Sequence, residues 1–122
     1  MVHFGMSHPV KRIRAVFFRS ETGAEPVREW LKSLDKEDRF KIGADIKTVE
    51  FGWPIGMPTC KPMKSGLFEV RTRLVNRIAR VLFCINDGCM VLLHGFIKKT
   101  QNTPQPDLDL ALERKRKLEK SS

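Results

Sequence analysis

The chain of 122 residues contains no tyrosine, only three cysteines and no long apolar run. Spanning a bilayer as a helix takes ~18 or more consecutive apolar residues, so we expect no transmembrane helix and no membrane partner. Cys60, Cys84 and Cys89 form no C-x-x-C pair, and no second cysteine or histidine stands at the spacing of a zinc site. We therefore expect reduced thiols, as in a cytoplasm, and no metal or other cofactor.

Motifs that name a reaction are also missing. The sequence has no glycine-rich phosphate loop, no H-E-x-x-H and no nucleophile elbow. The N-terminal residues MVHFGMSHPVKR lack the apolar region of a secretory signal, so a cytoplasmic location is expected. Function must therefore be inferred from patterning and charge.

Positive charge is what the chain has in excess. It carries 23 lysines and arginines against 14 acidic residues, a formal net charge of +9. Its length and its hydrophobic fraction of 41% predict a single globular domain over residues 1–122, with residues 1–11 as a flexible extension. For so small a domain, this charge favours a polyanionic partner, first nucleic acid and second an acidic protein.

The first half of the chain predicts one strand and two helices. Residues 12–18 are β-rich, and Pro26 suits the first turn of a helix. Apolar residues recur there at helical spacing: Val27, Trp30, Leu31 and Leu34. Asp35 is positioned to cap a second helix, whose inner face would carry Ile42, Ile46 and Val49 and which would end at Gly52.

The second half predicts a sheet and a final helix. Residues 54–66 contain prolines and glycines and are expected to form a loop. Residues 67–73, 77–85 and 90–97 resemble strands, and Asn86-Asp87-Gly88 indicates a hairpin between the last two. A helix is expected from about residue 103 to 120. The order β-α-α-β-β-β-α predicts an α+β fold, in which a helical hairpin and a C-terminal helix pack on a small, mostly antiparallel sheet.

Basic residues gather in the sheet-forming half of the chain. Between residues 58 and 101, only Glu69 and Asp87 oppose eight basic residues, namely Lys61, Lys64, Arg71, Arg73, Arg77, Arg80, Lys98 and Lys99. Strand alternation places Glu69, Arg71 and Arg73 on one face of their strand. Such a concentration on adjacent strands favours an anion-binding surface.

Each of these residues also has a structural explanation. Lysines at a strand end are commonly solvated or protect a sheet edge. Arg80 shares its face with Ile78, Leu82 and Cys84, so it is either paired or aimed into a concavity. Glu69 is expected to pair with Arg71 and position it. His94 is either a satisfied sheet histidine or a proton-transfer group, and the terminal ERKRKLEK is most simply a solvated helix face.

Three stretches resemble the HigB-type toxins of the RelE/ParE toxin–antitoxin superfamily, including its phage-derived branch. They are GLFEVR (66–71), RVLFCINDGCMVLLHGF (80–96) and KKTQNTP (98–104), and the order of elements matches as well. The resemblance implies a microbial-ribonuclease-like toxin that cleaves messenger RNA on the ribosome without a metal. It also implies a neutralising antitoxin with a helix-turn-helix domain, similar to HigA.

In such enzymes the ribose 2′-hydroxyl attacks the neighbouring phosphate, and the protein must move protons and stabilise a more negative phosphorane. The resemblance implies that Arg80 contacts the scissile phosphate, that Lys98 adds a second cation and that Arg71 completes the cationic floor. His94 is the candidate for proton transfer. Five further basic residues are implied in RNA binding: Lys61, Lys64, Arg73, Arg77 and Lys99.

One departure from the family pattern concerns tyrosine, which RelE-like enzymes often place near the terminal helix. Here base stacking would fall to Phe68, to Phe96 or to no residue. Two alternatives to the ribonuclease hypothesis stay open. One is a non-enzymatic, ParE-like inhibitor of DNA gyrase, and the other is an RNA- or ribosome-binding module with weak catalysis.

Overall fold

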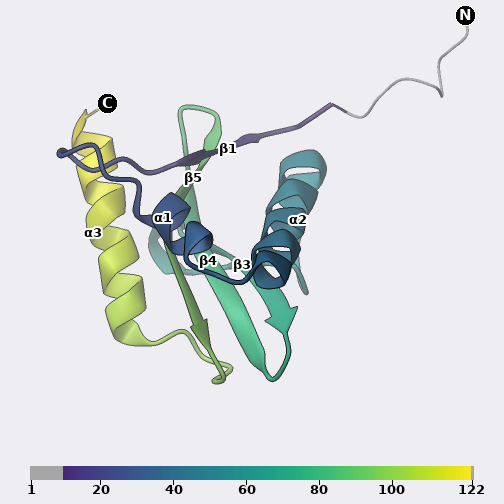
Figure 1. Cartoon of the computed structure of the whole chain (residues 1–122). Coiled ribbons are helices and arrows are strands. Elements are labelled where there is room, and N and C mark those ends of the chain that lie inside the picture. Colours follow the sequence, from purple (N-terminus) through teal and green to yellow (C-terminus); the bar gives the residue numbers. More distant parts are fainter. Residues whose placement is uncertain (1–9, 122) are drawn as a thin grey trace, which may run out of the picture.

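The computed structural model describes residues 10–121 and places a five-stranded sheet between two layers of helices (Figure 1). Most of the predicted N-terminal extension, residues 1–9, lies outside the described residues. The elements in chain order are β1 (Arg14–Phe17), α1 (Pro26–Lys32), α2 (Lys36–Gly52), β2 (Cys60–Pro62), the 3-10 turn η2 (Lys64–Gly66), β3 (Phe68–Leu74), β4 (Arg77–Asn86), β5 (Cys89–Lys98) and α3 (Gln105–Ser121). The α+β fold predicted from the sequence is confirmed.

The strand order in the sheet is β1-β5-β4-β3-β2, and only the β1–β5 pair is parallel. The predicted hairpin joins β4 to β5 through Asp87 and Gly88, whose φ angles are 51° and 75°. Two central residues with positive φ define the turn whose twist matches that of the flanking strands. The Asp-Gly sequence thus fixes the register of the two longest strands.

Residues 54–66 correct the sequence prediction, which made all of this segment a loop. Cys60–Pro62 pairs antiparallel with β3 as the edge strand β2, and a 3-10 turn follows it. Such a short strand shows no alternation, and a proline is tolerated at a sheet edge because its missing N–H faces away from the ladder. Pairing with β3, rather than local sequence, creates this strand.

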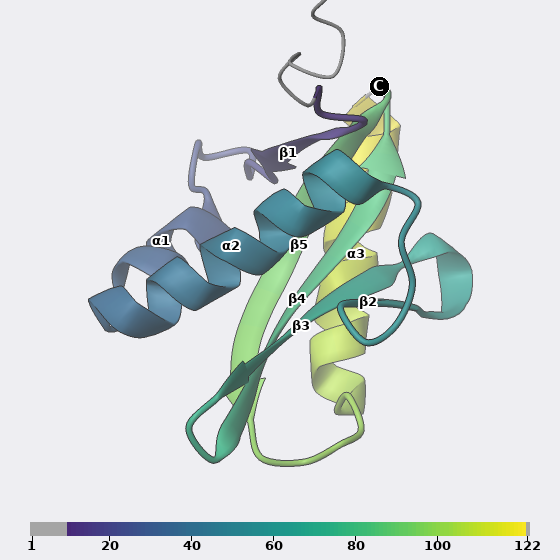
Figure 2. The ribbon, with the colours of Figure 1, turned by 90° about the vertical axis from the view of Figure 1, so that its right-hand side faces the viewer.

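Two apolar cores lie on opposite faces of the sheet. The first contains the inner faces of α1 and α2, including the predicted Val27, Ile42, Ile46 and Val49. The second contains Ala111 and the partly buried Leu108, Leu112 and Leu118 of α3. Figure 2 shows α2 crossing the sheet in front and α3 running behind it. The helical spacing of apolar residues therefore predicted correctly which side of each helix is buried.

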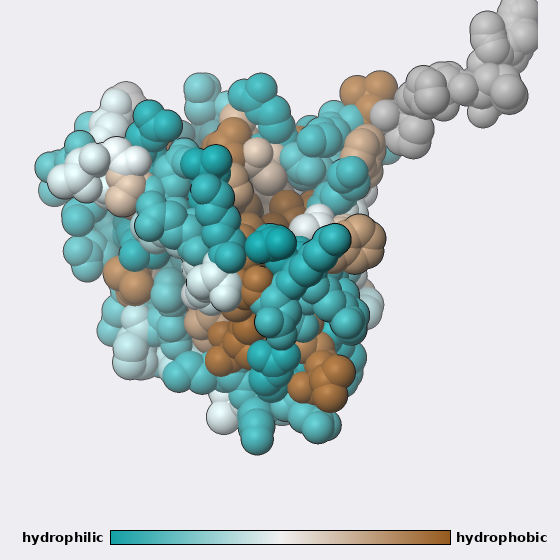
Figure 3. All heavy atoms as spheres, viewed as in Figure 1, coloured by the Kyte–Doolittle hydropathy of each residue, from teal (hydrophilic) through white to brown (hydrophobic). Residues whose placement is uncertain are grey.

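Some large apolar side chains remain at the surface. In the view of Figure 3, hydrophilic side chains cover most of the face, and apolar ones are visible between them. Among residues 10–121, the exposed large apolar side chains are Val10, Phe40, Met57, Val75 and Ile85.

A β-bulge in β5 changes which side chains face α3. Leu82 pairs with His94 but Phe83 pairs with Leu92, so Leu93 is an extra residue in the ladder. Leu93 packs into the α3-side core, and the adjacent His94 also reaches a residue of α3. The carbonyl of Leu93 accepts a hydrogen bond from Arg114 Nη1 at 2.7 Å, which satisfies a polar group that the bulge removes from regular pairing.

Candidate functional site

Strand register brings the predicted site residues into neighbouring rows on the α3 side of the sheet. Arg71 lies directly opposite Arg80, which in turn lies opposite Phe96. The next row joins Glu69, Leu82 and His94. Like charges directly opposite one another destabilise a sheet, so the two arginines require compensation.

Glu69 supplies part of this compensation from a fully buried position. Its Oε1 accepts a 2.8 Å hydrogen bond from Arg71 Nε and lies 3.7 Å from Arg80 Nε. Its Oε2 accepts a hydrogen bond from the Thr103 hydroxyl. The predicted pairing of Glu69 with Arg71 is confirmed, and the same carboxylate also faces Arg80.

Arg80 is fully buried, with 0% relative exposure. Its Nη2 donates to the carbonyls of Thr100 and Gln101, the latter at 2.8 Å, and its guanidinium carbon lies 5.9 Å from the Phe96 ring centroid. Burial lowers the pKa of Arg80, and the nearby Glu69 carboxylate opposes this effect. Of the two sequence-based alternatives for Arg80, the structure shows the paired one.

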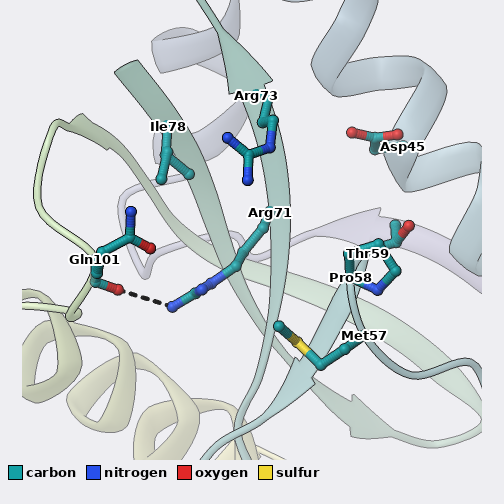
Figure 4. Close-up of a pocket in the computed structure, with 8 residues that line it drawn as sticks. All are labelled: Asp45, Met57, Pro58, Thr59, Arg71, Arg73, Ile78 and Gln101. Atoms are coloured by element: carbon teal, nitrogen blue, oxygen red, sulfur yellow. Dashed lines mark hydrogen bonds between the residues drawn. The ribbon is translucent and has the colours of Figure 1, made fainter. Parts of the chain in front are cut away.

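Arg71 lies at the edge of this buried cluster, where the protein surface forms a cleft of about 280 Å³ (Figure 4). Its Nη2 donates to the Gln101 carbonyl at 2.9 Å, so both arginines bind the same carbonyl oxygen. Arg73 lines the cleft beside it (Figure 4). The remaining lining residues are Asp45, Met57, Pro58, Thr59 and Ile78.

A second cleft, of about 260 Å³, adjoins the first and shares Arg73, Ile78 and Gln101 with it. It brings Arg73 together with Arg77 and Lys99, because the β3–β4 turn and the loop after β5 lie at the same end of the molecule (Figures 1 and 2). Arg77 is held by Asp38 at 2.9 Å. Lys98, also exposed, is the last residue of β5 and directly precedes the same loop.

His94 has a partner that the sequence did not indicate. Its Nε2 lies 2.6 Å from Asp107 Oδ1 in the first turn of α3, and its ring stacks on Phe96 with centroids 5.5 Å apart. The side chains of His94 and Asp107 are each 16% exposed. Phe96 thus contacts both His94, the predicted proton-transfer group, and Arg80, the predicted phosphate ligand.

Lys61 and Lys64 do not join these clefts. They line a separate groove of about 570 Å³ between the β2–η2 segment and α3, with an apolar floor that includes Met63, Leu67 and Leu108. Neither of the aromatic candidates for base stacking, Phe68 and Phe96, presents its ring at the surface beside the clefts or the groove. Phe68 packs with Trp53 and Phe83 in the first core, and Phe96 is buried at 7% exposure.

Among residues 10–121, no group of three or more histidine, cysteine, aspartate or glutamate side chains is placed to hold a metal ion. No helix within the same range is long and apolar enough to cross a membrane.

The chain matches a family of known proteins. The family model described as "Phage derived protein Gp49-like (DUF891)" matches residues 29–116, which include α2, the strands from β2 to β5 and most of α3. No curated protein matches the chain.

Proposed function

The chain belongs to the phage-derived Gp49-like family, a family of the RelE/HigB-like toxin group, and on this premise we propose that it is a HigB-type toxin that cleaves mRNA on the ribosome. The family is associated with toxin endoribonuclease activity, and it suggests an antitoxin partner. One observation supports the activity most. Arg71 and Arg80 lie side by side on adjacent strands, converge on one carbonyl oxygen, and share a single carboxylate.

The proposed reaction is attack of a ribose 2′-hydroxyl on the adjacent phosphate. The paired guanidinium groups of Arg71 and Arg80 match the geometry of phosphate oxygens and would stabilise the charge that develops on the phosphorane. Lys98, exposed at the end of β5, would add a further cation. This set needs no metal, since the charge is neutralised by side chains.

His94 is the proposed proton-transfer group. In the proposed arrangement His94 Nε2 donates to Asp107 Oδ1 across the 2.6 Å contact, which would leave the lone pair of Nδ1 to take a proton. Asp107 would act through His94 by holding its tautomer and orientation. The proposed RNA-binding surface consists of Arg73, Arg77 and Lys99 at one end and of Lys61 and Lys64 along the groove beside α3.

Primer extension on cellular mRNA after induction tests this proposal. Arg80→Ala should reduce cleavage by at least ~100-fold, as expected when a charge-stabilising donor is removed. Because Arg80 is buried, Arg80→Lys is the second variant: it retains the charge but loses the planar fork, and it should also cleave poorly. Arg28→Ala, on α1 across the sheet, is the matched control and should cleave normally. A folded Arg80→Ala protein with full cleavage would contradict the proposal.

The complete burial of Arg80 favours one further candidate, a non-enzymatic toxin of the ParE type that inhibits DNA gyrase by contact. Phe40 and Val75, at 76% and 71% exposure, would then be available to a protein partner. Induction distinguishes the two candidates. A ribonuclease yields new mRNA 5′ ends with intact DNA, whereas a gyrase inhibitor yields DNA damage with intact mRNA.

A further inference from the structure

The loop between β5 and α3, residues 99–104, covers the arginine pair. Its backbone carbonyls at Thr100 and Gln101 accept hydrogen bonds from Arg80. The Gln101 carbonyl accepts another from Arg71, and the Thr103 hydroxyl donates to Glu69. The polar contacts that join this loop to the sheet are therefore made by three sheet residues, Glu69, Arg71 and Arg80. The loop leaves Arg80 with no exposed surface.

The covered cluster is poorly compensated for a buried site. It holds two guanidinium groups against one carboxylate in direct contact with them, that of Glu69, while Asp107 acts on Arg80 without a direct contact. Arg80 Nε and Nη1 are buried and have no hydrogen-bond partner among the described residues. Buried donors without partners are rare, because each loses its hydration without a replacement. Neutral carbonyl oxygens are also weaker acceptors for guanidinium than anionic oxygens are.

These contacts have the form of an anion site closed by backbone. Two guanidinium groups from adjacent strands point at one oxygen, as they would at a phosphate oxygen. Arg80 Nη1 is a donor that a second anionic oxygen can satisfy, whereas Nε faces Glu69 Oε1 at 3.7 Å without a hydrogen bond. Lys98 at the end of β5 and Lys99 at the start of the loop are both exposed, so an approaching polyanion meets them before it meets Arg80.

We propose that residues 99–104 form a lid over a phosphodiester-binding site made by Arg71 and Arg80, and that RNA must displace the loop carbonyls to occupy it. This inference rests on the proposed function, and it adds that the free protein is held in a closed, autoinhibited state. The Thr103–Glu69 hydrogen bond stabilises the closed lid. The apparent affinity for RNA is then reduced by the fraction of molecules that are closed.

Modification of arginines by phenylglyoxal, mapped by mass spectrometry, tests the lid in the intact chain. In the wild type, the exposed Arg73 should react readily and Arg80 at least about tenfold more slowly. Thr103→Val removes the hydroxyl that holds the closed lid, and loss of one hydrogen bond to a charged group should raise the reaction rate of Arg80 by roughly tenfold. Thr48→Val is the matched control, since it removes one hydroxyl bond on α2 and should leave Arg80 slow.

A 2′-O-methyl RNA oligonucleotide, which cannot be cleaved, provides the second measurement. By fluorescence polarisation, it should bind Thr103→Val several-fold more tightly than the wild type, and it should protect Arg80 from phenylglyoxal. The double variant Thr100→Gly/Gln101→Gly loosens the loop without touching Glu69 and should act in the same direction. This variant keeps the test valid if Thr103→Val perturbs folding, which thermal melting would reveal.

Two results would overturn the lid. One is an Arg80 that reacts as fast as Arg73 in the wild type, and the other is loop variants that change neither reactivity nor affinity. The outcome is separable from that of the proposed function. If the lid opens and the oligonucleotide binds, but the protein never cleaves RNA, only the ribonuclease proposal is refuted. If the protein cleaves RNA and the loop variants do not change cleavage, only the lid is refuted.

Discussion

At the scale of single residues, Gly95 shows how one atom can decide a local structure. A Cβ built at this position would lie 2.4 Å from two carbons of the Trp30 ring. Trp30 belongs to α1, which covers the face of the sheet opposite α3. The absence of a side chain at Gly95 therefore serves the packing of α1 on β5, and it does not open the backbone to a ligand on the arginine side.

Gly95→Ala should consequently destabilise the fold. We expect the free energy of unfolding to fall by about 1–3 kcal/mol, since the indole ring must move to admit the methyl group. Gly43→Ala is the control: Gly43 lies within α2 with no atom near its Cβ position, so alanine should stabilise the helix by about 0.5–1 kcal/mol. Urea denaturation measures both. Equal stability of Gly95→Ala and wild type would show that the Trp30 ring can move aside without a measurable loss of stability.

At the scale of elements, the bulge in β5 links the sheet to α3. The extra residue Leu93 leaves a carbonyl that Arg114 satisfies at 2.7 Å. Burial lowers the pKa of the Arg114 guanidinium, with Glu113 acting in the opposite sense. Arg114 was part of the segment expected to be a solvated helix face, so that prediction was wrong at this position, whereas Arg116 is exposed.

Arg114→Met should weaken the docking of α3 on the sheet. Methionine retains the apolar stem but not the donor, so the Leu93 carbonyl loses its partner, at a cost of about 1.5–3 kcal/mol. Arg116→Met removes the same charge from an exposed position and should change stability by less than about 0.5 kcal/mol. Thermal unfolding and amide hydrogen exchange in α3 measure the difference. Equal effects of the two variants would mean that Arg114 contributes only its charge.

At the scale of the whole molecule, the sequence predicted local features better than contacts between distant segments. Helical and strand spacing identified the long elements, and the i, i+2 relation on one strand predicted the Glu69–Arg71 pair. The closure of the site was not predictable in this way, because Thr100 and Gln101 contribute backbone carbonyls, which carry no side-chain signal. Asp107 reaches His94 only because α3 folds back across the sheet. Strand β2 exists only through its pairing with β3.

Both apolar cores contain a free cysteine, Cys60 in the α1–α2 core and Cys84 in the α3 core. Burial raises the pKa of each thiol from an ordinary 9.0 to about 11, and Glu69 adds to the effect at Cys60. In the unfolded chain these thiols ionise near pH 9, while in the fold they stay protonated. Their contribution to stability is therefore complete below pH 9 and is lost as the pH rises through 11.

The protein should accordingly lose stability between pH 9 and 11, by up to about 2–3 kcal/mol for each thiol. The chain has no tyrosine, whose ordinary pKa of about 10 would otherwise add to the change in this window. Urea denaturation at pH 8 and pH 10.5 measures the loss. The Cys60→Ala/Cys84→Ala variant should be less stable at pH 8. It should lose less stability on going to pH 10.5, because it lacks the two buried thiols. Any loss of stability from lysines that titrate in this range is common to both proteins and cancels in the comparison. Equal losses in the two proteins would show that the buried thiols do not govern the alkaline limit of the fold.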